Sequence, residues 1–163
     1  MDRNRLGNIK MTKLLFVCHG NICRSPMAEF IFKKMISDKK LEKGFLIDSA
    51  ATSTEEIGND MHRGAKETLL RMNVPFSPKR ARQITTEDYH TYDLLIGMDI
   101  ENLYRMQKLW KNDPDNKVKL LLSYAGKDKD IADPWYTGDF DKTYMDLIEG
   151  CDALLKSLCQ ENA

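Results

Sequence analysis

The sequence has 163 residues, enough for one hydrophobic core, and its 25 basic side chains are balanced by 25 acidic ones. A formal net charge of zero argues against a general affinity for nucleic acid or anionic lipid, so we expect no nucleic-acid and no membrane partner. No apolar run approaches the roughly 20 residues that cross a bilayer, and the run at 14–17 is too short for a signal peptide, so we expect a soluble, cytoplasmic protein.

The first predicted elements lie around a short apolar run near the start of the chain. Residues 1–12 are polar, and we interpret them as a flexible N-terminal extension that precedes a single domain at 13–163. Residues 13–17 (KLLFV) predict a buried strand that leads into a loop. Ser25 and Pro26 then predict the start of a helix, with the serine hydroxyl as its cap and the proline at its first position.

Strands and amphipathic helices alternate through the rest of the chain. Apolar runs predict strands at 45–49, 93–98 and 118–122. Helices are predicted from Asp60 to a stop at 73–75, from 100 to 110, and from Phe140 through Leu158. Strands that are apolar throughout and are separated by helices are typical of a parallel sheet covered on both faces. The sequence therefore predicts an α/β fold with about four strands.

Two distal cysteines and a basic run have structural interpretations. Cys151 and Cys159 lie in one predicted helix about 12 Å apart, beyond the reach of a disulfide, so we expect reduced core or surface residues. The run KRAR at 79–82 is interpreted as a solvated face rather than a docking patch, because the chain as a whole is neutral.

The most informative segment is the loop at 18–25 (CHGNICRS), which joins the first predicted strand directly to the first predicted helix. Backbone N–H groups at such a junction are unpaired, and the helix dipole favours negative charge there. Gly20 and Asn21 tolerate the positive φ angles that a tight loop requires. The loop is therefore predicted to bind an anion such as phosphate.

Two side chains in this loop predict a reaction centre. The dipoles that attract phosphate also stabilise a thiolate, so we expect Cys18 to be a nucleophile at neutral pH. Arg24 follows after five intervening residues, and its planar guanidinium can hold two phosphoryl oxygens in the transition state of phosphoryl transfer. Ser25 caps the helix, donates its hydroxyl to the Cys18 sulfur, or does both.

Other interpretations of the loop fit the sequence less well. A cysteine at the end of a strand is usually an inert core residue, but here an arginine and a Ser-Pro helix start accompany it. The loop lacks the Gly-Lys-Ser/Thr of nucleotide-binding loops. Cys18 and Cys23 have no second ligand pair after them, which disfavours zinc, so we expect no metal.

A general acid is expected at the carboxyl edge of the sheet, where every strand-to-helix loop of a parallel sheet emerges. Asp133 fits best, because it lies between the last strand and the last helix and the following proline keeps it out of helical conformation. Trp135 and Tyr136 either form a wall for an aryl phosphate or pack against the core. Asp48 and Asp99 end other strands and are alternative donors.

The sequence resembles the low-molecular-weight protein tyrosine phosphatase family from about Lys13 to the final helix. The segment VCHGNICRSPMAE at 17–29 matches the family's phosphate loop at all but one position. Agreement continues at 48–50, 57–58, 81–84, 98–99 and 133–134.

The resemblance implies a fold and a mechanism. The fold would be a three-layer, flavodoxin-like or Rossmann-like sandwich with the phosphate loop between the first strand and the first helix. Cys18 would form a phosphocysteine intermediate, Arg24 would bind the phosphoryl group, and Asp133 would protonate the leaving phenol and then activate water. Tyrosine-phosphorylated proteins would be the substrates of a monomer or weak homodimer that needs no cofactor. The remaining phosphate-binding or supporting residues would be His19, Gly20, Asn21, Ile22, Cys23 and Ser25, with Asn21 holding the loop, Ser25 stabilising the thiolate and Cys23 able to pair with the nucleophile.

Several positions depart from the common family pattern. Glu55 stands in the substrate wall where many members have an aromatic residue, and His19 stands where many have Leu or Thr. A family histidine that supports the loop is replaced near Asn73. Relatives that prefer phosphoarginine carry Thr at the position of Ile22, so this residue favours tyrosine phosphate.

Three functions remain as hypotheses: a tyrosine phosphatase, a phosphate-binding module without catalysis, and a phosphoarginine or arsenate enzyme. The three predicted catalytic residues argue against the second. Arsenate reductases of this fold use two further cysteines after the third strand, and the sequence has none there.

Overall fold

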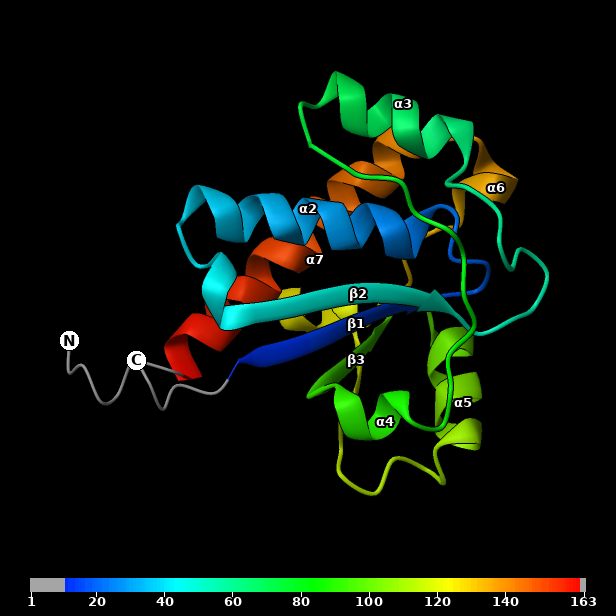
Figure 1. Ribbon diagram of the computed structural model, residues 1–163, viewed down its shortest axis with the longest axis vertical. Helices are drawn as coiled ribbons and strands as arrows, with labels where there is room; N and C mark the ends of the chain where they lie inside the picture. Colours follow the sequence, from blue (N-terminus) through cyan, green and yellow to red (C-terminus); the bar gives the residue numbers. More distant parts are fainter. Residues whose placement is uncertain (1–10, 162–163) are drawn as a thin grey trace.

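The computed structural model describes residues 11–161 and contains a four-stranded parallel sheet (Figure 1). Its strands are β1 (Thr12–Cys18), β2 (Phe45–Ala51), β3 (Leu94–Gly97) and β4 (Val118–Leu120). They lie in the order β2-β1-β3-β4, so β1 has a parallel partner on each side. The predicted α/β fold is confirmed. Residues 1–10, most of the predicted extension, lie outside the described residues.

Helices cover both faces of the sheet and complete three layers (Figure 1). One face carries α2 (Arg24–Asp38) and α7 (Phe140–Glu161), with α3 (Arg63–Arg71) packed against both helices. The other face carries α4 (Asp88–Thr91) and α5 (Ile100–Leu109). Short helices in the connections are η1 (Glu42–Gly44), η2 (Leu121–Ala125) and α6 (Pro134–Thr137). None of the helices within residues 11–161 is long and apolar enough to cross a bilayer.

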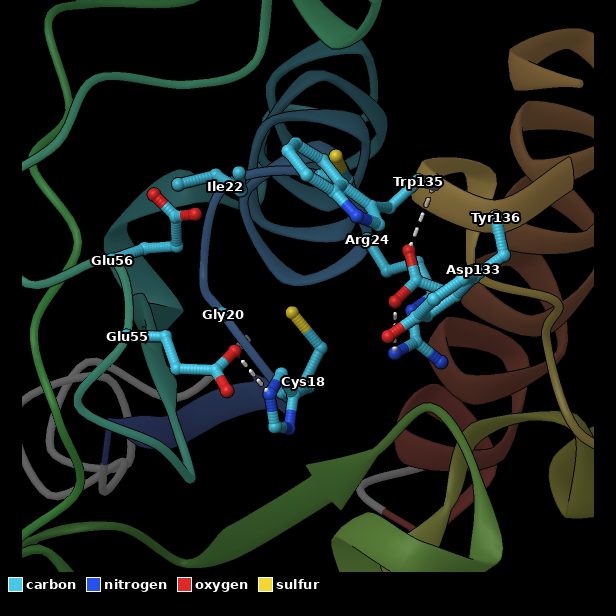
Figure 2. Close-up of a pocket in the computed structure, with 11 residues that line it drawn as sticks. Cys18, Gly20, Ile22, Arg24, Glu55, Glu56, Asp133, Trp135 and Tyr136 are labelled. Carbon is cyan, nitrogen blue, oxygen red and sulfur yellow. Dashed lines mark hydrogen bonds and ion pairs between the residues drawn. The ribbon is translucent and has the colours of Figure 1, made fainter. Parts of the chain in front are cut away.

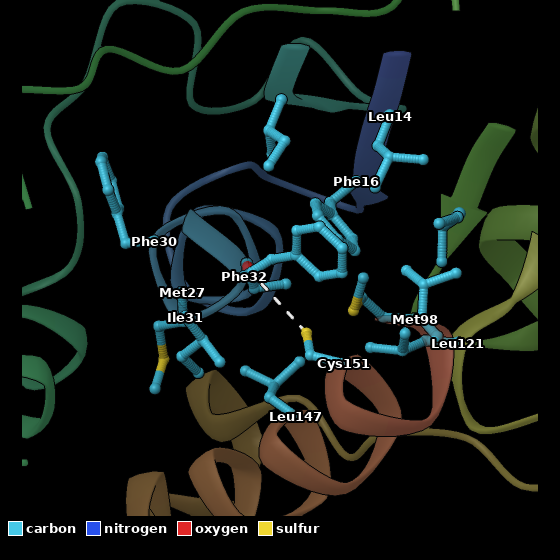
Figure 3. Close-up of a cluster of buried hydrophobic side chains, with 14 of the residues drawn as sticks. Leu14, Phe16, Met27, Phe30, Ile31, Phe32, Met98, Leu121, Leu147 and Cys151 are labelled. Atoms are coloured by element: carbon cyan, nitrogen blue, oxygen red, sulfur yellow. Dashed lines mark hydrogen bonds between the residues drawn. The ribbon is translucent and has the colours of Figure 1, made fainter. Parts of the chain in front are cut away.

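Alternate side chains of β1 enter the two halves of the hydrophobic core. Leu14 and Phe16 pack with residues of α2 and α7 (Figure 3), and Leu15 and Val17 pack on the opposite face. All four side chains are fully buried, which explains why this strand is apolar throughout rather than alternating. Cys18 continues the alternation of Leu14 and Phe16 and lies at the end of the same cluster.

Helix α3, the second of the predicted helices, begins later than the sequence predicted. Asp60 does not cap it, because its carboxylate pairs with Lys66 Nζ at 2.7 Å. His62 is the N-cap instead, and its Nδ1 accepts a hydrogen bond from Gly64 N at 2.9 Å. Histidine is not among the usual capping residues, so the local signal at Asp60 indicated the wrong position.

The segment that precedes α6 is held against the end of β3. Ile131 N donates a hydrogen bond of 2.9 Å to the carbonyl oxygen of Met98, the residue that follows β3. The fourth strand ends at Leu120, two residues earlier than predicted, because the chain turns into η2 there. This connection carries residue 133 to the same edge of the sheet as the loop that follows β1.

Candidate active site

The loop that follows β1 curls around the sulfur of Cys18, which is almost fully buried. The backbone N–H groups of Asn21 and Ser25 point at Cys18 Sγ from 3.3 and 3.4 Å. The Cys18 thiol donates a hydrogen bond of 3.0 Å to Ser25 Oγ. When the thiol is ionised, the serine hydroxyl can rotate and donate to the sulfur, so three donors then surround a thiolate.

Asn21 gives the loop its sharp turn. Its φ of +59° lies in the left-handed region, which asparagine tolerates better than most residues. Its Nδ2 donates to Ser25 Oγ at 2.9 Å and to Ser49 Oγ at 3.0 Å, and its Oδ1 accepts from Arg82 N at 3.2 Å. The expectation of a positive φ is thus met at Asn21 but not at Gly20.

Ser25 does not cap the helix, contrary to the sequence prediction. Helix α2 begins two residues earlier than predicted, at Arg24, with Cys23 as its N-cap and no side-chain hydrogen bond at that position. The hydroxyl of Ser25 is already engaged by Cys18 and Asn21, so it is not available to the helix terminus. The alternative interpretation, contact with the Cys18 sulfur, is the one that the structure supports.

Arg24 reaches from the start of α2 to the loop residues at the far side of the pocket. Its Nη1 donates to Asp99 Oδ2 at 2.7 Å and to the Ile131 carbonyl at 3.0 Å, and its Nη2 donates to Asp133 Oδ2 at 3.4 Å. Burial by itself would lower the pKa of the guanidinium, but the charges of Cys18, Asp99 and Asp133 outweigh burial and raise it. Arg24 is therefore a fixed cation beside Cys18.

Asp133 lies at the start of α6, where its Oδ1 accepts a hydrogen bond of 3.1 Å from Trp135 N. Pro134 occupies the first helical turn, as expected from its missing N–H. Trp135 and Tyr136 are exposed beside Asp133 and line the pocket with it (Figure 2). The Trp135 ring meets His62 edge to face at 5.7 Å, a contact that the sequence did not indicate.

The opposite wall of the pocket is acidic (Figure 2). Glu55 and Glu56 line it together with Gly20 and Ile22 of the loop. Glu55 Oε2 and His19 Nε2 lie 2.8 Å apart. The structure therefore brings to one pocket the predicted residues of the loop, the predicted acid and the predicted wall, which are Cys18, His19, Gly20, Ile22, Cys23, Arg24, Glu55, Asp133, Trp135 and Tyr136.

A buried charge network supports the loop from behind, and sequence reasoning missed it. Ser49 Oγ, which receives the bond from Asn21, donates at 2.6 Å to Glu29 Oε1. Glu29 is only 3% exposed and pairs with Lys33 Nζ at 2.6 Å and Lys79 Nζ at 3.3 Å. Glu29 follows Ser25 by one helical turn, so helical periodicity was the available signal that it faces the loop.

The prediction about the basic run is wrong. The run at 79–82 is not a solvated face, since Lys79 and Arg82 both pair with Asp48, at 2.6 and 3.3 Å. Asn73, near which the family histidine is replaced, lies just beyond α3 with a φ of +58°. Lys79, a member of the basic run, supports the loop through its pair with Glu29.

Neither alternative acid is free to act as the proton donor. Asp48 carries the ion pairs with Lys79 and Arg82. Burial opposes its ionisation, but the hydrogen bond and charge of Lys79, with the charge of Arg82, outweigh burial and lower its pKa. Asp99 pairs with Arg24 and accepts from Asn102 N at 2.7 Å in the capping box of α5.

Replacing Lys79 by methionine is expected to lower the free energy of unfolding at pH 7 by about 2 kcal/mol, because the nearly buried Glu29 loses a counter-ion. Lys34→Met is the matched control, since its exposed pair with Asp38 contributes less than about 0.5 kcal/mol. Denaturant titration measures both variants. The lowered pKa of Asp48 means that its share of the stabilisation is present above the ordinary value of 3.8 and is lost as the pH falls below it. The gap between wild type and Lys79→Met should therefore narrow in acid, and equal stabilities at pH 7 would contradict the assignment.

The four cysteines are all unpaired. Burial raises the pKa of the Cys23 thiol, and the nearby charges of Cys18 and Asp133 raise it further, so Cys23 stays protonated. Cys151 is buried in the core and Cys159 is exposed on α7, in agreement with the prediction of core or surface residues. Within residues 11–161, no three His, Cys, Asp or Glu side chains are close enough together to hold a metal ion.

Comparison with known proteins supplies the family. The model of the low molecular weight phosphotyrosine protein phosphatase family matches residues 13–163. The chain belongs to this family. Members are hydrolases with a cysteine nucleophile, and the resemblance that the phosphate loop suggested is confirmed.

Relatives of this phosphatase family match over nearly their whole length. The low molecular weight protein-tyrosine-phosphatase YfkJ of Bacillus subtilis is 40% identical over 154 residues, which cover 93% of this chain and 98% of YfkJ. The human low molecular weight phosphotyrosine protein phosphatase is 40% identical over 148 residues, covering 88% and 93%. The crystal structure of YfkJ superimposes with a TM-score of 0.91 at 38% identity, covering 94% and 98%. A Drosophila arginine phosphatase superimposes with a TM-score of 0.83 at 29% identity, covering 90% and 98%.

Proposed function

We propose that this phosphatase hydrolyses phosphotyrosine in proteins through a phosphocysteine intermediate on Cys18, with Arg24 as the phosphate-binding residue and Asp133 as the general acid and base. The observation that carries the proposal is the set of contacts around Cys18 Sγ, two backbone N–H groups that donate to it and the Ser25 hydroxyl 3.0 Å away, at the floor of a pocket that Arg24 and Asp133 also line. A sulfur at the floor of an open pocket, with backbone N–H groups pointing at it, is placed to act as a nucleophile rather than as an inert core thiol.

In the first step, the Cys18 thiolate attacks the phosphorus atom of the bound monoester. The S–P bond forms as the P–O bond to the tyrosine ring breaks, and the electron pair leaves with the phenolic oxygen. A proton on Asp133 moves to that oxygen, so the leaving group departs as a neutral phenol. The guanidinium of Arg24 and the loop N–H groups stabilise the charge on the equatorial phosphoryl oxygens.

In the second step, water attacks the phosphocysteine. Asp133, now a carboxylate, accepts a proton from the water as the P–O bond forms and the S–P bond breaks. The electron pair returns to sulfur, and inorganic phosphate leaves. The wall of Trp135 and Tyr136 beside Asp133 suits the aryl group of the substrate, which must stand on the same side as the acid.

We further propose that residues 13–163 act as one domain, as a monomer or weak homodimer without a cofactor. A nucleophilic thiol works only while it is reduced, and the four cysteines are unpaired, which supports a reducing compartment such as the cytoplasm.

The proposed function is tested with p-nitrophenyl phosphate and a phosphotyrosine peptide in the presence of EDTA. We expect hydrolysis of both, with release of inorganic phosphate. Phosphoarginine and arsenate are offered side by side, because an arginine phosphatase is among the similar structures. Faster turnover of either of these than of phosphotyrosine would overturn the substrate assignment.

Peroxide is expected to inactivate the enzyme reversibly. Peroxide oxidises the Cys18 thiolate to a neutral sulfenic acid, and the loss of the Cys18 charge removes one of the causes that keep Cys23 protonated. Cys23 then loses its proton as its sulfur attacks the Cys18 sulfur, the hydroxyl of the sulfenic acid leaves with that proton as water, and a disulfide forms that a dithiol reduces. Both cysteines line the same pocket, which supports the pairing. In Cys23→Ser the Cys18 sulfenic acid has no thiol partner, so excess peroxide oxidises it further to the sulfinic acid and the dithiol should not restore activity, whereas Cys159→Ser should recover like wild type. Equal recovery of all three proteins would exclude Cys23 as the partner.

A further inference from the structure

The pocket carries an excess of negative charge that the whole chain does not. Its lining includes the carboxyl side chains of Glu55, Glu56 and Asp133 but only one guanidinium, that of Arg24, which already pairs with Asp99 and Asp133, so the charges of the two glutamates are not balanced by an arginine or lysine of the pocket. The chain has equal numbers of acidic and basic side chains. Carboxylates at the pocket wall repel a phosphate dianion and do not help to bind it. Any favourable contact that they make is therefore with another part of the substrate.

The charges have different places in the pocket. Arg24 is buried at the inner end and is held by Asp99 and Asp133, so its charge serves the phosphoryl group. The two glutamates stand on the outer wall, across the pocket from Trp135 (Figure 2). The side chain of Glu55 is 68% exposed, so it is open to groups that approach from solvent.

The position of Glu55 is fixed by a neighbour in the phosphate loop. Its carboxylate bonds to the ring of His19, the residue that follows Cys18. Ser53, two residues before it, is tied to the same loop residue by a hydrogen bond of 2.9 Å from its Oγ to the His19 carbonyl. The Glu55 carboxylate is thereby held at the rim next to the reaction centre.

We propose that this acidic wall selects phosphotyrosines that have lysine or arginine as neighbours in the substrate chain, and that Glu55 is the main residue in this selection. The inference rests on the proposed function and adds the class of substrate. With the phosphotyrosine ring between the walls, the flanking side chains lie at the rim. A cation there meets the carboxylate of Glu55, and an acidic side chain is repelled by it.

The test compares two phosphotyrosine peptides that differ only in their flanking residues, lysine and arginine in one and glutamate in the other. We expect kcat/KM to be about tenfold higher for the basic peptide at low ionic strength. Two or more ion pairs at the rim would give this ratio if each raises kcat/KM by up to about fivefold. High salt should reduce this ratio, because exposed charges are screened.

Charge reversal separates selection from a structural role. Glu55→Gln should reduce the ratio to about threefold or less, and Glu55→Lys should invert it in favour of the acidic peptide. Glu149→Gln is the matched control, since Glu149 lies on α7 in an exposed pair with Lys127 and does not line the pocket. It should leave the ratio unchanged.

The possible results distinguish the proposed phosphatase function from the proposed selection by Glu55. Hydrolysis of p-nitrophenyl phosphate, which has no flanking residues, reports the catalytic site alone. If that substrate and both peptides are hydrolysed but the peptides react equally, the inference about Glu55 is overturned and the phosphatase assignment stands. If Glu55→Lys retains the preference for the basic peptide, Glu55 is not the selecting residue. If p-nitrophenyl phosphate is not hydrolysed, the proposed function fails and this inference fails with it.

Discussion

Replacing Cys18 by serine is expected to reduce the turnover of p-nitrophenyl phosphate by at least about 10,000-fold while the fold is retained. The loop N–H groups that point at Cys18 Sγ stabilise negative charge on the sulfur, but a serine hydroxyl gives up its proton far less readily than a thiol does. Steady-state kinetics measures the loss, and thermal unfolding verifies that the variant is folded.

Two further measurements sharpen the result for Cys18. Cys159→Ser, at an exposed cysteine on α7, should keep full activity and so controls for general effects of the substitution. The Cys18→Ser protein should still bind inorganic phosphate, because Arg24 and the loop N–H groups remain. Full activity in Cys18→Ser would remove the proposed mechanism altogether.

Replacing Asp133 by asparagine is expected to slow hydrolysis of phosphotyrosine or phenyl phosphate by about 100-fold to 1,000-fold. The effect on p-nitrophenyl phosphate should be much smaller, about tenfold, because that leaving group departs without a proton. Asparagine can still accept the hydrogen bond from Trp135 N, so the start of α6 is preserved and only the proton is lost.

The comparison of leaving groups is the decisive measurement for Asp133. Asp139→Asn is the control, since Asp139 Oδ1 likewise accepts a backbone hydrogen bond, from Lys142 N, at an exposed position outside the pocket. Asp139→Asn should leave the turnover of both substrates unchanged. An equal loss for activated and unactivated phenols in Asp133→Asn would show that the residue positions the substrate and does not supply the proton.

The parts of the fold that depend on local sequence could be predicted. The run at 13–17 is apolar because both faces of β1 are covered, and the alternation of such runs with amphipathic helices was enough for the fold class. The phosphate loop could also be found, because Cys18, Asn21 and Arg24 lie within seven residues of one another. Their spacing and the helix that follows were enough to predict an anion-binding loop.

The parts that depend on distant pairs could not be predicted. Asn21 is supported by Ser49, Ser49 by Glu29, and Glu29 by Lys79, each a partner 20 to 50 residues away. Nothing local shows that a lysine in a basic run turns inward. The same holds for Ser25, where a Ser-Pro pair is a good capping signal, but the nearby sulfur and amide compete for the hydroxyl.

The proposed nucleophile and the proposed acid lie on backbone segments that are held very differently. Cys18 ends a strand that is bonded on both sides, whereas Asp133 is carried by a helix of only four residues in an exposed connection. Local opening costs least where few buried contacts hold the backbone. Mild denaturant should therefore unfold the segment around Asp133 first. The remaining enzyme should still hydrolyse activated aryl phosphates such as p-nitrophenyl phosphate but should hydrolyse phosphotyrosine poorly. The two activities would then be lost at two different denaturant concentrations, one for local opening around α6 and one for unfolding of the sheet.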